Sequence, residues 1–121
     1  MKDVMQAFEP EVRQWFNEAY AAPSPPQVEG WPSIARGENT LIMAPTGSGK
    51  TLAAFLWSIN LLQRELSAGA EPLAVHTLYI SPLKALNYDI QHNLKSPLKE
   101  MEKIAGKRLG IRVGVRTGDT S

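Results

Sequence analysis

The octapeptide APTGSGKT, residues 44–51, concentrates residues that could bind an anion between two apolar segments. Gly47 and Gly49 carry no Cβ atom, so the backbone can adopt positive φ and approach a phosphate closely. A helix beginning near Lys50 would add free N–H groups and the positive end of its dipole. The spacing therefore predicts a phosphate-binding loop between a strand and a helix.

Two side chains at the end of this loop could complete the chemistry. Lys50 can reach the β- and γ-phosphates of a nucleotide, and the Thr51 hydroxyl can ligate Mg²⁺, which prefers oxygen ligands. The strict form of the pattern begins with Gly, whereas this chain has Ala44. We expect Thr46, Gly47, Ser48, Gly49, Lys50 and Thr51 to bind the cofactor, with Lys50 and Thr51 as the catalytic residues and Thr51 as the Mg²⁺ ligand.

The surrounding pattern predicts an α/β fold. Short apolar or β-branched segments predict strands over 41–44, 73–80 and 110–115. Helical patterns cover 10–20, about 24–37, 50 to about 66, 83 to about 95, and 97–105, with Pro97 as an interruption. Strands that alternate with helices indicate a mainly parallel sheet with right-handed crossovers.

Composition narrows the class of protein. The chain has 121 residues and no cysteine, which excludes a disulfide framework and a thiolate metal site. No apolar run reaches the roughly 20 residues that span a bilayer, and we expect a cytoplasmic protein. Residues 1–40 hold three basic and six acidic residues, whereas 84–116 hold eight basic and three acidic ones. The basic second part is a weak indication of a polyanionic partner.

Several segments together resemble a superfamily 2 helicase. The segment APTGSGKTLAAFLWSINLL is similar to motif I, PSPPQ to the Q motif, SPLKALNYD to motif Ia, and VRTGDTS to the TGD segment that follows. Their order over residues 8–121 resembles the N-terminal part of an Lhr-type (large helicase-related) ATP-dependent helicase. The resemblance implies an incomplete RecA-like P-loop NTPase domain that binds ATP, Mg²⁺ and single-stranded or partly duplex nucleic acid, with DNA more strongly implied than RNA.

The resemblance also implies roles for single residues. Gln27 would recognise adenine, since an amide can donate to and accept from its edge at once. One aromatic residue of the first helical region could stack on the base, with Phe8, Phe16 and Tyr20 as candidates. The nucleic-acid contacts would come from Pro82, Lys84, Arg116, Thr117, Gly118 and Asp119.

These residues lack two parts of the catalytic site that such a helicase needs. Asp3, Asp89 and Asp119 are followed by Val, Ile and Thr, so the Asp-Glu pair that would position the attacking water does not occur. A second RecA-like domain with an arginine finger is not present either. We therefore expect an N-terminal fragment, with a helical Q-type segment over 1–37 and the first part of the ATP-binding domain over 38–121, that needs the remainder of the helicase chain for catalysis.

Two other functions fit parts of the pattern. A non-catalytic P-loop module that binds nucleotide or nucleic acid would explain the missing Asp-Glu pair equally well. A small P-loop phosphotransferase is less favoured, because such an enzyme needs an arginine-rich lid and residues 52–81 contain only Arg64.

Overall fold

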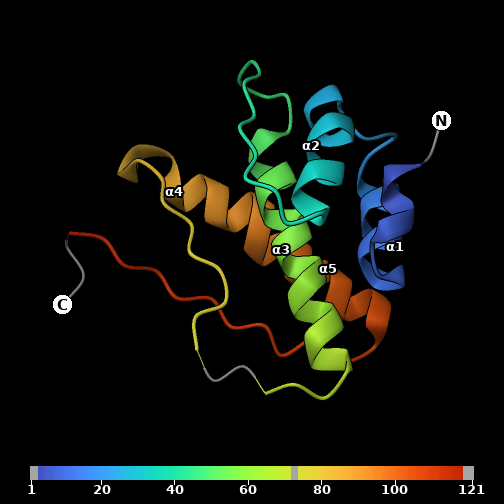
Figure 1. Cartoon of the computed structure of the whole chain (residues 1–121). Helices are drawn as coiled ribbons and strands as arrows, with labels where there is room; N and C mark the ends of the chain where they lie inside the picture. The colour runs from blue at the N-terminus through green and yellow to red at the C-terminus, as the bar shows by residue number, and fades with distance from the viewer. Residues whose placement is uncertain (1–2, 72–73, 119–121) are drawn as a thin grey trace.

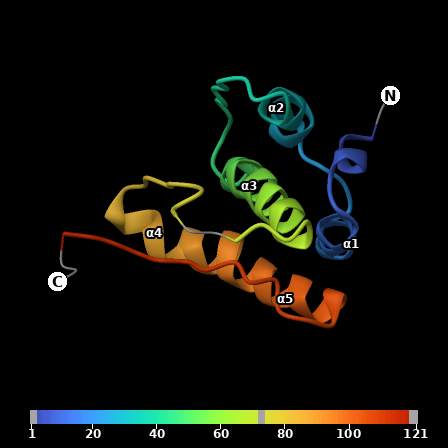
Figure 2. The same ribbon diagram turned by 60° about the horizontal axis from the view of Figure 1, so that its bottom comes forward.

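The computed structural model describes residues 3–71 and 74–118, and the regular elements of this part are helical. The helices are η1 (Val4–Ala7), α1 (Pro10–Ala19), α2 (Pro25–Ala35), α3 (Lys50–Ser67), α4 (Leu83–Ile90) and α5 (Ser96–Ala105), and a π-helical turn, η2 (Gln91–Lys95), joins α4 to α5. Helix α3 lies between α2 and the α4–α5 rod, and α1 packs directly against α5 (Figures 1 and 2). This central helix follows directly on the predicted phosphate-binding loop.

The predicted helices around the loop are confirmed. Helix α1 begins at Pro10, which is tolerated there because the first N–H groups of a helix have no partner within it. Helix α2 begins after Ser24, whose backbone N–H donates to Gln27 Oε1 at 3.0 Å. Helix α3 begins at Lys50 as predicted and ends one residue beyond the predicted Leu66.

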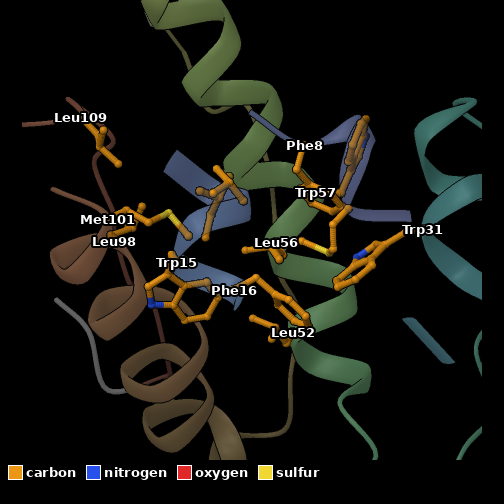
Figure 3. Close-up of a cluster of buried hydrophobic side chains, with 13 residues drawn as sticks. Phe8, Trp15, Phe16, Trp31, Leu52, Leu56, Trp57, Leu98, Met101 and Leu109 are labelled. Atoms are coloured by element: carbon orange, nitrogen blue, oxygen red, sulfur yellow. The ribbon is translucent and has the colours of Figure 1, made fainter. Parts of the chain in front are cut away.

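One hydrophobic core connects the N-terminal helices with α3 and α5 (Figure 3). Phe16 and Leu56 are fully buried, and Phe8 makes edge-to-face contacts with Trp31 and Trp57, with ring centroids 5.0 and 5.1 Å apart. Trp15 Nε1 donates to Glu100 on α5, so a polar contact also joins α1 to α5. The boundary at residue 37 stays a prediction, and the core takes residues from both sides of it.

The segment from residue 83 to residue 105 is one continuous helical rod, whereas the sequence predicted two helical pieces separated at Pro97. Proline removes a backbone N–H and its ring clashes with the carbonyl four residues earlier. The turn of η2 lies immediately before α5 and widens the helix there, so Pro97 fits in the first turn of α5. The chain therefore continues past the proline instead of breaking.

The predicted strands do not form among residues 3–71 and 74–118. Residues 41–44, 74–80 and 110–115 run as outstretched segments without a ladder, as Figure 1 shows for the chain after α3 and after α5. A strand exists only through backbone hydrogen bonds to a neighbouring strand. Side-chain burial nevertheless alternates from Ile111 to Thr117, which is the period-two pattern of a strand.

The first two of these segments expose large apolar side chains. Five large ones are 78–85% exposed: Leu41, Met43, Val75, Leu78 and Ile80. Such residues are normally covered in a finished sheet, so the segments have the composition of strands that lack their neighbours. Within the described part of the chain, no helix is both long and apolar enough to cross a bilayer.

Candidate nucleotide-binding site

The loop before α3 has the backbone geometry that the sequence predicted. Gly47 and Gly49 adopt φ values of 82° and 86°, in the left-handed region that favours glycine. The backbone N–H and the hydroxyl of Ser48 both donate to the carbonyl of Pro45, which closes the turn. A Cβ added at Gly47 would meet no atom within 4 Å, so the surface of the loop is open at this residue.

Helix α2 fixes the chain on both sides of this loop. Before the loop, Ile42 packs so closely against α2 that a Cβ at Gly30 would lie 2.9 Å from Ile42 Cδ1. After the loop, Trp31 Nε1 donates to the carbonyl of Ala53 in the first turn of α3, at 3.0 Å and fully buried. The entry and exit of the loop are therefore attached to one rigid element, α2.

Gln27 makes a third contact from α2, to the loop itself. Its Nε2 donates to the carbonyl of Gly49 at 3.2 Å, and its Oε1 accepts from Ser24, so both ends of the amide are engaged within the protein. The side chain is buried, with 4% of the residue exposed. A Cβ at Gly49 would collide with Gln27 Nε2, so any other residue there would displace the Gln27 amide as well as strain the backbone at positive φ. The adenine contact assigned to Gln27 stays a prediction, beside this positioning role.

Lys50 and Thr51 occupy the first positions of α3, where backbone N–H groups have no intrahelical acceptor. Both residues are half-buried, and Gly49 precedes them as the left-handed residue from which the helix begins. The N-terminal end of α3, the positive φ of the loop and the cationic Lys50 therefore lie together. These groups suit a phosphate chain with its Mg²⁺, because Thr51 adds a hydroxyl oxygen of the kind that Mg²⁺ binds.

The three aromatic candidates for base stacking differ in how far their side chains are exposed. Phe8 and Phe16 are buried in the core, with 3% and 0% of each residue exposed. Tyr20 is 43% exposed and stacks on Phe16, with ring centroids 5.1 Å apart. Tyr20 is therefore the candidate among the three whose ring has a face available to a ligand.

The predicted nucleic-acid residues lie on two segments. Pro82 and Lys84 are exposed at the start of α4, and Arg116 and Gly118 are exposed near the end of the described chain, with Thr117 half-buried between them. In Figures 1 and 2 these two segments reach the same end of the molecule. Asp119 lies outside the described residues.

Sequence reasoning did not select two polar residues close to α3, Tyr79 and Asp89. The Tyr79 hydroxyl donates to Asp89 Oδ2 at 2.9 Å, and its ring packs on Phe55 with centroids 4.4 Å apart. Partial burial raises the pKa of Tyr79, an effect that the Ser81 hydroxyl opposes and the Asp89 carboxylate reinforces. The hydroxyl therefore stays protonated, as a donor, at neutral pH. In the sequence, the only indication of this pair is that a tyrosine stands shortly before the SPLKAL segment.

Comparison with known proteins identifies the class. The model of the DEAD/DEAH box helicase family matches residues 24–120, and the chain belongs to this family. Its relatives include an Lhr helicase and probable uracil glycosylase of Mycolicibacterium smegmatis, 48% identical over 106 residues, and an ATP-dependent helicase Lhr-Core of Sulfolobus acidocaldarius, 43% identical over 125 residues. These matches cover 85% and 99% of this chain but only 7% and 14% of the relatives.

A solved structure agrees with the sequence matches. The structure of Mycobacterium smegmatis helicase Lhr bound to ssDNA and AMP-PNP is similar to this chain with a TM-score of 0.81 and 46% identity. The match covers 99% of this chain and 15% of that one. The chain is thus an Lhr-like member of the helicase family, and it spans about a seventh or less of the length of these relatives.

Proposed function

We propose that this chain forms the ATP- and Mg²⁺-binding part of a longer, Lhr-like ATP-dependent helicase that moves along single-stranded or partly duplex nucleic acid. The observation that carries the proposal is the loop of residues 44–51, with left-handed Gly47 and Gly49, which opens α3 and is attached to α2 through Gln27. Mg²⁺ bound with the nucleotide would supply charge neutralisation and a Lewis acid for phosphoryl transfer.

Each residue of the loop has a proposed role. The backbone from Thr46 to Gly49 holds the phosphate chain, Lys50 contacts the β- and γ-phosphates, and the Thr51 hydroxyl ligates the metal ion. Gln27 and Tyr20 act at the base, through a remaining amide hydrogen and lone pair and through ring stacking. The complete catalytic unit is a RecA-like domain whose parallel sheet includes the segments 41–44, 73–80 and 110–115.

The proposed contacts with nucleic acid come from the two exposed segments at one end of the molecule. Pro82 and Lys84 at the start of α4, and Arg116 to Asp119, would line the path of the strand, where lysine and arginine neutralise phosphates. Single-stranded DNA is the proposed partner, supported by the ssDNA-bound Lhr structure that this chain resembles. The proposed location of the enzyme is the cytoplasm.

The first test is the loss of the P-loop lysine in the complete helicase that contains this chain. Lys50→Ala should reduce DNA-stimulated ATP hydrolysis by at least about 10³-fold, because the cation that stabilises the transferred phosphoryl group is removed. Lys107→Ala, at an exposed lysine after α5, is the matched control and should hydrolyse ATP at the normal rate. Folded wild-type protein without magnesium-dependent affinity for AMP-PNP, measured by calorimetry, would refute the proposed function.

A second test concerns the base. Tyr20→Leu keeps an apolar side chain but removes the stacking surface, which is worth about 1 kcal/mol or more. We expect roughly a fivefold weaker affinity for AMP-PNP and no change in affinity for inorganic triphosphate, which has no base. Equal affinities of Tyr20→Leu and wild type for AMP-PNP would remove Tyr20 from the site.

The 121 residues alone should hydrolyse little or no ATP. Their sequence contains no Asp-Glu pair to position the attacking water. Turnover by the isolated chain at the rate of a complete helicase would contradict this expectation.

A further inference from the structure

We propose that Tyr79 and Asp89 form a positioning pair that couples the nucleotide end of α3 to the nucleic-acid end of α4. This inference rests on the proposed function and assigns a role to Tyr79, which precedes the motif Ia segment, and to Asp89, the last residue of that segment. The juxtaposition that carries it is the hydrogen bond from the Tyr79 hydroxyl to Asp89 Oδ2, at 2.9 Å, beside the first turns of α3.

Tyr79 is held against the face of α3 that carries Thr51. Its ring packs on Phe55, and Phe55 follows Thr51 by four residues, so the two side chains lie on one face of the helix. Phe55 therefore places the Tyr79 ring about one turn of α3 after Thr51, the proposed Mg²⁺ ligand, while the Tyr79 hydroxyl bonds to α4.

On α4, the residue that accepts the hydrogen bond from Tyr79 is Asp89. Asp89 is half-buried, and Leu86, three residues earlier on the same helix, is buried at 8% exposure. These two residues face the body of the protein, whereas Lys84 is exposed. A bond at Asp89 therefore constrains the rotation and position of α4, and through them the direction in which Lys84 points.

The pairing also has suitable chemistry for a link that depends on the nucleotide. A hydrogen bond to a carboxylate is stronger than one between neutral groups, and this one is partly buried. A movement of the first turns of α3 on nucleotide binding would shift Phe55 and the Tyr79 ring that packs on it. The hydrogen bond from Tyr79 to Asp89 would pass this shift on to α4.

The experiment compares variants of the complete helicase in binding a fluorescein-labelled oligothymidylate, by fluorescence anisotropy, with and without AMP-PNP. Tyr79→Phe removes the hydroxyl and keeps the ring, and Asp89→Ala removes the acceptor. Each should weaken oligothymidylate binding in the presence of AMP-PNP by about fivefold to tenfold, the range of one charge-assisted hydrogen bond that is partly exposed. The affinity for AMP-PNP without DNA should change less than about twofold, since the phosphate contacts remain.

Two further variants separate a positioning role from a general loss of structure. The double variant Tyr79→Phe/Asp89→Ala should bind DNA no more weakly than either single variant, because one bond is lost in all three. Asp89→Asn retains an oxygen that accepts from the tyrosine but loses the charge, so its DNA binding should fall between that of wild type and that of Asp89→Ala. Tyr88→Phe is the matched control, because Tyr88 is 64% exposed on the same helix and should leave binding unchanged.

The outcomes decide the inference separately from the proposed function. Normal DNA binding by Tyr79→Phe, or effects of Tyr79→Phe and Asp89→Ala that add in the double variant, would overturn the positioning pair while leaving the helicase assignment intact. Equal losses with and without AMP-PNP would also overturn it, because the link would then not depend on the nucleotide. Wild-type protein that binds neither AMP-PNP nor DNA would refute the proposed function instead.

Discussion

The two sides of the predicted phosphate-binding loop differ in how far contacts within this chain hold them in place. On the helical side, α2 contacts the loop and its flanks: Gly30 packs on Ile42, Gln27 donates to Gly49, and Trp31 donates to Ala53 in a buried bond. On the other side, the segments that the sequence predicts as strands expose apolar residues such as Met43 and Ile80 and form no ladder in the described chain. Helices close their backbone hydrogen bonds locally, whereas strands need partners that are distant in sequence.

The largest effect is expected from removing the contact between α2 and the start of α3. Trp31→Ala should destabilise the chain by about 3–5 kcal/mol, because it empties the site of a tryptophan that is 1% exposed and removes the bond to Ala53. Trp31→Phe keeps most of the volume and should cost less, about 1–2 kcal/mol. Urea unfolding followed by far-ultraviolet circular dichroism measures both. A loss below about 1 kcal/mol for Trp31→Ala would show that α2 does not fix the loop.

An intermediate effect is expected at the loop. Gly49→Ala should destabilise the chain by about 2 kcal/mol, because alanine is strained at a φ of 86° and its Cβ would collide with Gln27 Nε2. Gly47→Ala meets the same backbone strain but no neighbouring atom within 4 Å. The difference between the two variants in urea unfolding isolates the contact with Gln27, and equal losses would show that the contact is not tight.

The smallest effect is expected at Met43, with Ile42 on the opposite face of the same outstretched segment as the comparison. Met43→Lys should change the free energy of unfolding by less than about 0.5 kcal/mol, since Met43 is 85% exposed. Ile42→Lys should cost about 2 kcal/mol or more, because Ile42 packs against α2 at Gly30. Met43→Lys should also reduce self-association of the isolated chain in analytical ultracentrifugation. Similar losses of stability for the two variants would remove the distinction between the faces.

The sequence predicted the helical part well because its signals are local. Pro10, Ser24 and Lys50 mark helix starts that the structure confirms. The positive φ at Gly47 and Gly49 follows from residue type and the P-loop pattern. The roles assigned to the loop residues, to Lys84 and to Arg116 stay predictions.

Other features depend on contacts that spacing does not encode. The continuity of α4 through α5 depends on the π-helical turn, which no residue pattern before Pro97 indicated. The contact of Gln27 with Gly49 and the pairing of Tyr79 with Asp89 join residues 22 and 10 positions apart, and both depend on how helices pack. The sheet was predicted from strand-like composition, and the described chain lacks the neighbouring strands that such segments require.

The unbroken rod from Leu83 to Ala105 gives the molecule a lever arm of roughly 35 Å at the helical rise per residue. Its C-terminal end is anchored in the core by the fully buried Met101, whereas its N-terminal end carries the exposed Lys84. Between these ends, the buried Leu86 and the bond of Asp89 to Tyr79 also hold the rod, so a tilt that moved Lys84 would have to displace both contacts. Movements of the core and of Tyr79 therefore converge on one surface residue.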